Sequence, residues 1–226
     1  MYFRGQLTKH EPYISPILSG FSVLKTRLHI LSTLLFIACF LTQLSTKANL
    51  PGFGFYNELT IQASQVSGTG SHTDFPVLIH HIDPDLATTA NGGDVENVNG
   101  WDIYFTASDG TTILDHQIES YNAVTGEIAM WVRIPSLSTS VNTTIRMYYG
   151  NAAIAVDPSV TSVWDANYQG VWHLHNDEFD ATTNTNHLAA TGTSNLASSI
   201  IAGGQTFSFN DNLNGGSQPG LQISGD

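Results

Sequence analysis

The chain has 226 residues, of which 7 are Lys or Arg and 19 are Asp or Glu, so its formal net charge is −12 with neutral histidines. After Leu50, 18 acidic residues remain but only two basic ones, Arg133 and Arg146. A surface of this kind repels phosphate backbones and anionic lipid headgroups. We therefore expect neither nucleic acid nor a membrane surface as a partner of the mature domain.

The N-terminal part of the chain has the order of an export signal. Lys25 and Arg27 precede the apolar stretch 28–44, and small residues follow up to Ala48. This order predicts an export signal with a long lead over residues 1–48, cleaved after Ala48. Export would place the protein in the periplasm, at the cell surface or outside the cell. The alternative is a membrane anchor through residues 28–44, although polar residues interrupt a stretch that should hold about 20 apolar ones.

The lone cysteine of the chain, Cys39, lies within this signal. If the signal is removed, the mature chain has no cysteine. Disulfides, thiol catalysis and Cys-ligated zinc are then excluded together.

Six short apolar stretches follow the signal, separated by clusters of Gly, Asn, Asp, Ser and Thr. They are ELTIQASQV (58–66), FPVLIHHI (75–82), WDIYFTAS (101–108), TILDHQIESY (112–121), GEIAMWVRIP (126–135) and TTIRMYYG (143–150). Their length and their β-branched and aromatic residues are typical of strands. ASDGTT (107–112) and NAVTG (122–126) supply the glycines of hairpin turns. The pattern predicts an all-β fold, an antiparallel, jelly-roll-like β-sandwich.

Strict alternation along these strands assigns side chains to faces. It places Trp131 and Arg133 on one outer face, and Arg146 and Tyr148 on an outer face as well. The expected core residues are Ile128, Met130, Val132 and Ile134 on the first strand and Ile145, Met147 and Tyr149 on the second. We expect the two strands to be neighbours.

The two arginines allow two interpretations. If the hairpin turn pairs Tyr121 with Glu127, Asp115 lies opposite Arg133, and the arginine has a structural role beside a carboxylate. The alternative is an anion- or sugar-binding patch, because a cation beside an aromatic ring suits such ligands. The candidate binding residues of that patch are Trp131, Arg133, Arg146 and Tyr148.

The motifs DFPVLIH, GWDIYFTASDGTTILDHQIESYN, WVRIP and TTIRMYYGN, in this order over Gly54 to Trp164, resemble the bacterial domain of unknown function 2341. One departure is Gln117, which stands where a Glu is usual. The resemblance implies a β-sandwich domain, with bounds at residues 54–165, in an exported multidomain protein of the cell envelope. It implies no catalytic residues.

The sequence VWDANYQGVWHLHND resembles the junction at which such domains pass into a laminin G-like, concanavalin A-like sandwich. We place the boundary between Trp164 and Gly170. Residues 170–226 are too few for a complete lectin-like sandwich, which needs well over ~100 residues to bury its sheets. We therefore expect an incomplete second β-sandwich and a chain that is a fragment.

Several polar motifs suggest metal or catalytic chemistry. His173 and His175 have the spacing of a metal pair, but a core or capping role is the simpler interpretation of His173. Oxygen-rich loops around Asp83 and Asp180 could hold Ca²⁺, although ordinary turns explain them as well. We expect no cofactor, with Ca²⁺ as the open alternative.

Sequence motifs of hydrolases, zinc proteases and P-loop enzymes are absent, but two carboxylates suffice for a glycosidase. The sequence therefore favours a non-catalytic structural or binding module of an exported envelope protein, in contact with a glycan or another envelope protein. The alternative is a fragment of a carbohydrate-active enzyme, with its acids at Asp177, Glu178 and Asp180.

Overall fold

The structure is a computed structural model, and it describes residues 8–10, 50–175, 177–197, 199, 201–217 and 221. The predicted export signal lies outside the described residues, apart from 8–10. Within the described ranges no helix combines the length and the apolar character that a bilayer crossing requires.

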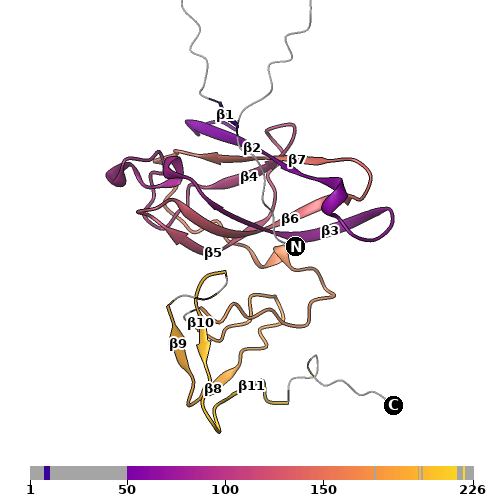
Figure 1. Ribbon diagram of the computed structural model, residues 1–226, viewed down its shortest axis with the longest axis vertical. Coiled ribbons are helices and arrows are strands. Elements are labelled where there is room, and N and C mark those ends of the chain that lie inside the picture. Colours follow the sequence, from indigo (N-terminus) through magenta and orange to yellow (C-terminus); the bar gives the residue numbers. More distant parts are fainter. Residues whose placement is uncertain are drawn as a thin grey trace, which may run out of the picture.

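The prediction of an all-β, antiparallel fold is confirmed, and two sheets form the layers of the N-terminal part (Figure 1). One sheet has the order β1-β2-β7-β4 and the other the order β3-β6-β5. The strands of the first sheet are β1 (Thr8–His10), β2 (Phe55–Ile61), β7 (Thr143–Tyr149) and β4 (Tyr104–Ala107). Those of the second are β3 (Ser71–Ile82), β6 (Glu127–Ser138) and β5 (His116–Asn122).

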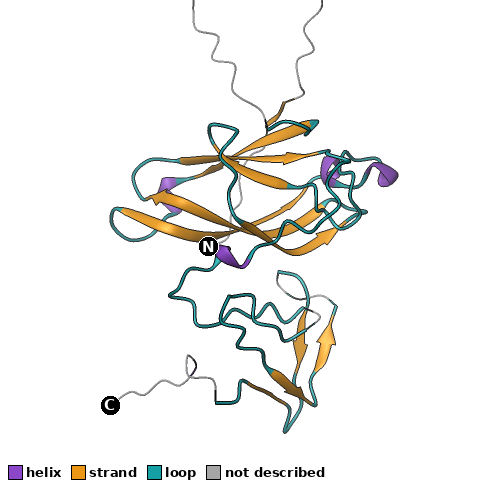
Figure 2. Ribbon diagram, turned by 180° about the vertical axis from the view of Figure 1, so that it is seen from behind, coloured by secondary structure: helices purple, strands orange, loops and turns teal. Residues whose placement is uncertain are grey.

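The helices of the described residues are single 3₁₀ turns in the connections, visible as purple ribbons in Figure 2. They are η1 (Ala63–Gln65), η2 (Pro84–Leu86), η3 (Thr89–Asn91) and η4 (Thr161–Val163).

The core lies between the two sheets and follows the predicted alternation. The inward side chains of β6 and β7 are buried, among them Ile128, Met130, Val132, Ile134, Ile145, Met147 and Tyr149. Two polar side chains share this interior, Asn57 on β2 and His116 on β5. Burial lowers the pKa of His116, whose Nδ1 lies 3.2 Å from the Leu114 carbonyl oxygen.

The two strands that carry the arginines lie in different layers, because β6 pairs with β3 and β5 whereas β7 pairs with β2 and β4. The expectation that they are neighbours is wrong. Strands consecutive in sequence can cross from one sheet to the other, and alternation cannot distinguish this from a hairpin.

The pairing of β5 with β6 contains a β-bulge at Glu119. Near the turn, Tyr121 lies opposite Ile128, one residue away from the expected partner Glu127. Beyond the bulge the register shifts by one, so that His116 pairs with Val132 and Asp115 lies beside Arg133. The expected turn pairing was therefore wrong, while the expected neighbours Asp115 and Arg133 are confirmed.

Asp102, from the WDIYF motif, ties together two loops at one end of the sandwich. Its carboxylate is fully buried and accepts hydrogen bonds from the backbone N–H groups of four residues at 2.8–3.2 Å. The donors are Glu96, Asn97, Gly150 and Asn151. The first two donors and the last two come from loops about 50 residues apart in the sequence, so one side chain holds both loops in place.

The second segment, after residue 165, lies beneath the β3-β6-β5 sheet in both views (Figures 1 and 2). Its described residues form two two-stranded antiparallel sheets. These pair β8 (Ala189–Thr191) with β11 (Asn212–Asn214), and β9 (Ser194–Leu196) with β10 (Gly204–Thr206). The domain bounds 54–165 and 170–226 and the incomplete second sandwich stay predictions.

Candidate functional site

The outer face of the β3-β6-β5 sheet carries a cluster that connects it to the second segment. We call it the joint, and its members are Gln117 and Glu119 of β5, Trp131 of β6, and Trp164, His173 and His175 of the chain that follows β7. Alternation turns the first three outward, because their neighbours Ile118 and Met130 face the core. The second segment then covers what would otherwise be a solvent-facing sheet surface.

Tryptophan rings form the apolar part of the joint. The centroids of Trp131 and Trp164 are 5.2 Å apart, and Tyr168 packs edge-on against Trp164 at 5.3 Å. Trp164 is 6 % exposed, and its Nε1 donates to Gln117 Oε1 at 2.9 Å. Tilted ring pairs at this distance stabilise the fold by their ring–ring interaction, in addition to the apolar area that they bury.

Glu119 provides the buried charge of the joint, with 6 % of its side chain exposed. Its carboxylate accepts hydrogen bonds from Trp131 Nε1 and, at 3.1 Å, from His173 Nδ1. Burial raises the pKa of Glu119, but the hydrogen bond and charge of His173, together with the Trp131 donor, outweigh burial and leave the pKa below its usual value. The ionised carboxylate is the form that these donors stabilise.

Both ring nitrogens of His173 face acceptors. Nδ1 faces the Glu119 carboxylate, and Nε2 lies 3.0 Å from Gln117 Oε1. That amide atom also accepts from Trp164, which fixes it as the oxygen. A neutral imidazole has one N–H group, so both contacts are hydrogen bonds only when His173 is protonated.

The neighbouring histidine adds a second contact to β5. His175 Nδ1 lies 3.3 Å from the Glu119 carbonyl oxygen and donates to it. Both histidines thus hold β5 to the second segment, while the core or capping role of His173 in an opening strand stays a prediction. Among the described residues there is no group of three or more His, Cys, Asp or Glu side chains that could hold a metal ion.

The four candidate binding residues do not form one patch. Trp131 and Arg133 lie on the outer face of the β3-β6-β5 sheet, and Arg146 and Tyr148 on that of the opposite sheet. Trp131 belongs to the joint, while Arg133 lies between Asp74, at 3.0 Å, and Asp115, at 3.3 Å. The structure thus adds Asp74 to the partner that the sequence indicated.

Arg146 is fully buried rather than displayed at a surface. Its Nε donates to Glu58 Oε1 at 3.3 Å, its Nη1 to the Tyr148 hydroxyl at 3.3 Å, and its guanidinium lies 5.0 Å from the centre of the Tyr56 ring. Tyr148 in turn donates to the Gly110 carbonyl at 3.3 Å. These contacts join β2, β7 and the turn after β4.

The oxygen-rich loops bind their own backbone. Asp83 accepts from the Asp85 N–H at 3.0 Å, and Asp180 accepts from the N–H groups of Val171, Thr182 and Asn186 at 2.8–2.9 Å. Burial raises the pKa of Asp180, but these N–H donors outweigh it and lower the pKa. Such contacts are the ordinary turn chemistry that the sequence offered as one interpretation.

Sequence reasoning did not find the joint. It placed Gln117 and Glu119 outward and treated the WHLH motif separately, and no pattern indicated that the two would meet. One signal could have connected them. An outward carboxylate needs a donor as partner, and in a chain that has no lysine after Leu50 the histidines are candidates for that partner.

Comparisons with known proteins agree with part of the resemblance drawn from the sequence. No curated protein and no solved structure matches the chain. Residues 99–188 match the family model described as Domain of unknown function (DUF2341). This matched stretch starts and ends later than the stretch Gly54 to Trp164 that carries the motifs, and it contains every member of the joint.

Proposed function

We propose that the chain is a non-catalytic structural and binding module of an exported bacterial cell-envelope protein, in contact with a glycan or with another envelope protein. The observation that carries this proposal is the joint. The buried Glu119 carboxylate accepts hydrogen bonds from Trp131 and from His173. Together with the contact of His173 with Gln117 and a pair of tryptophans, it holds the second segment against the sandwich. An arrangement of this kind suits a module that presents loops in a fixed orientation.

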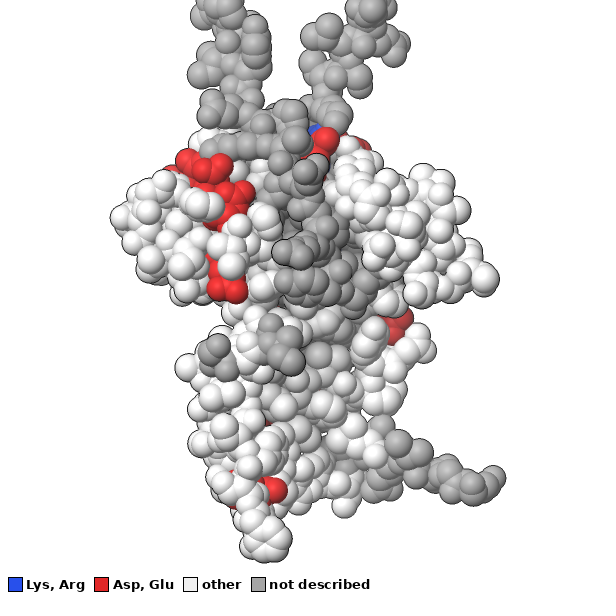
Figure 3. Space-filling view, in the orientation of Figure 1, with Lys and Arg blue, Asp and Glu red and all other residues white. Residues whose placement is uncertain are grey.

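The export part of the proposal is supported by the order of residues 25–48, in which basic, apolar and small residues follow one another. The acidic character of the described surface supports a partner other than nucleic acid. Figure 3 shows separate groups of acidic side chains on the sandwich and near the tip of the second segment, with a largely uncharged surface between them. Uncharged surface is suited to neutral glycans and to proteins.

The second segment is proposed to begin a laminin G-like, concanavalin A-like sandwich. Its short antiparallel pairs, β8 with β11 and β9 with β10, support this assignment.

The acids considered for a carbohydrate-active enzyme are engaged elsewhere, which supports the non-catalytic role. Asp180 holds a turn, Glu178 accepts from Gln205, and Asp177 accepts from the Phe179 N–H at 3.1 Å.

Incubation of the full chain with purified peptidoglycan and with neutral polysaccharides tests the proposal. We expect the protein to be retained on at least one of these polymers, or on an envelope protein extracted with it, with no new reducing ends. The appearance of reducing ends that increase with time would overturn the non-catalytic assignment. N-terminal sequencing of the mature protein tests export, and an unprocessed Met1 on a cytosolic protein would overturn that part.

A further inference from the structure

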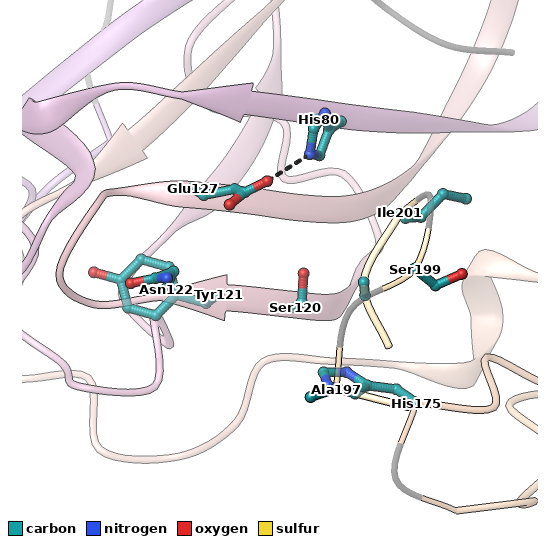
Figure 4. A pocket seen from close by; sticks show the side chains of 10 residues that line it. His80, Ser120, Tyr121, Asn122, Glu127, His175, Ala197, Ser199 and Ile201 are labelled. Atoms are coloured by element: carbon teal, nitrogen blue, oxygen red, sulfur yellow. Dashed lines mark hydrogen bonds and ion pairs between the residues drawn. The ribbon is translucent and has the colours of Figure 1, made fainter. Parts of the chain in front are cut away.

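A cavity of about 370 Å³ lies beside the joint on the outer face of the β3-β6-β5 sheet (Figure 4). Its volume falls within the range of roughly 300–1,000 Å³ typical of small-ligand pockets. The lining residues come from both parts of the chain: His80, Ser120, Tyr121, Asn122 and Glu127 from the sandwich, and His175, Ala197, Ser199, Ile201 and Ala202 from the second segment. The cavity therefore exists only where the joint holds the two parts together.

The register of the sheet explains how the sandwich side is built. Ser120 of β5 and His80 of β3 both lie opposite Ala129, on either side of β6. Two positions nearer the turn, and so on the same face, Asn122 lies opposite Glu127. Because of the bulge at Glu119, Ser120 shares the outer face with Glu119, so the cavity and the joint are adjacent.

The side chains around the cavity offer both donors and acceptors. Glu127 Oε1 binds His80 Nε2 at 3.0 Å, which leaves Oε2 as an acceptor. His175 donates through Nδ1 to Glu119, which leaves Nε2 as an acceptor in the neutral ring. Asn122 Oδ1 accepts from two backbone N–H groups, which leaves its Nδ2 as a donor. The Ser120 hydroxyl can act as either.

The charge of the lining limits the ligand. No Lys or Arg is among the residues that line the cavity, and Glu127 is an acid. Phosphate, sulfate and carboxylate groups would meet no cation from these residues and would be repelled by the carboxylate. Hydroxyl groups, which both donate and accept, match the mixed set of partners, and the aliphatic side chains of Ala197, Ile201 and Ala202 can pack against C–H groups.

We propose that this cavity binds a neutral, hydroxyl-rich sugar unit. The proposal rests on the proposed function, since it names the site through which the module would contact a glycan. A single sugar unit of this size should bind with a dissociation constant on the order of millimolar. Its affinity depends on the joint, because His175 belongs to both.

Nuclear magnetic resonance of the full chain tests the site, with the imidazole signals of His80 and His175 as the readout. Glucose and N-acetylglucosamine are the neutral probes, and glucuronate is the anionic comparison. We expect at least one neutral sugar to shift both imidazole signals, and glucuronate to bind about tenfold more weakly or not at all. Ser120→Leu, which fills the cavity, should abolish the shifts. Ser136→Leu, at an exposed position of β6 outside the cavity, should preserve them.

Glu127→Gln provides a second variant if Ser120→Leu does not fold, because it keeps the size of the side chain and removes the charge. It should weaken binding of the neutral sugar measurably. Absence of any shift with both neutral sugars up to about 50 mM, unchanged shifts in Ser120→Leu, or equal binding of glucuronate would each overturn the site. If Ser120→Leu is still retained on a polysaccharide, the cavity is ruled out while the proposed function stands.

Discussion

His173 and Glu119 meet across the joint, with 3.1 Å between the imidazole Nδ1 and the carboxylate Oε2. They are 54 positions apart in the chain, one on a sandwich strand and the other at the start of the second segment. The carboxylate is the better placed of the two to test, because its hydrogen-bond partners are known and its pKa lies below the usual value.

Glu119→Gln should destabilise the full chain by about 1–3 kcal/mol, since it replaces a buried charged acceptor by a neutral amide. We expect urea unfolding to show the loss, and tryptophan emission to shift to longer wavelength as Trp131 and Trp164 become wetter. Glu96→Gln is the matched control, because Glu96 is exposed and should change stability by less than about 0.5 kcal/mol. Equal stability of the two variants would contradict the role given to Glu119.

The contribution of Glu119 should depend on pH in a defined direction. Its pKa is lower in the folded chain than the unfolded value of about 4.3, so its contribution is complete above about pH 4.5. It is lost as the pH falls through the lowered folded-state pKa. The difference in unfolding free energy between wild type and Glu119→Gln, measured from pH 7 to pH 3, should therefore shrink in the acid range. A constant difference would show that the carboxylate is not the titrating group.

Arg133 should couple weakly to both of its aspartates. All three side chains are partly exposed, so each pair should contribute about 0.2–1 kcal/mol. Double-mutant cycles of Arg133→Gln with Asp74→Asn and with Asp115→Asn, read by urea unfolding, measure the two couplings. The shorter distance to Asp74 favours the larger coupling there. Additive effects in both cycles would contradict a stabilising contribution from either ion pair.

Arg146→Gln should destabilise the chain more than Arg133→Gln does. The buried guanidinium donates to Glu58 and to the Tyr148 hydroxyl, and its loss leaves these groups with fewer donors. We expect a decrease of at least about 1.5 kcal/mol in the free energy of unfolding. The same substitution at the partly exposed Arg133 is the control. A smaller effect at Arg146 would mean that water replaces the arginine at little cost.

Asp102→Asn should be among the most damaging single substitutions, at about 3 kcal/mol, because four backbone N–H groups share one carboxylate. The amide keeps one acceptor oxygen and turns an NH₂ group toward N–H donors. Thermal unfolding of the variant should occur well below that of wild type. A shift of less than a few degrees would show that the loops find other acceptors.

Much of the fold could be predicted from the sequence because period-two alternation reports which side chains face the core. All six apolar stretches contain strands, and the inward residues of β6 and β7 are those expected. Alternation carries no information on which strands share a sheet. It could therefore not predict that the two arginines lie on opposite faces of the sandwich and not in one patch.

The joint and the cavity were harder to predict, because each is made by segments that are distant in sequence. The spacing of His173 and His175 singles them out in the sequence, but alternation places their partners on β5 only on an outer face. Asp102 could not be predicted, since a single Asp after Trp101 has no pattern to distinguish it from a turn residue.

The bulge at Glu119 changes the phase of a strand in mid-course. Before it, odd-numbered residues of β5 point outward; after it, even-numbered ones do, as Ser120 and Asn122 show. A single extra residue thus lets one face present a carboxylate and a hydroxyl side by side, which an uninterrupted strand cannot do. Deleting or inserting one residue here would return the strand to a single phase and separate the two functions that it now serves.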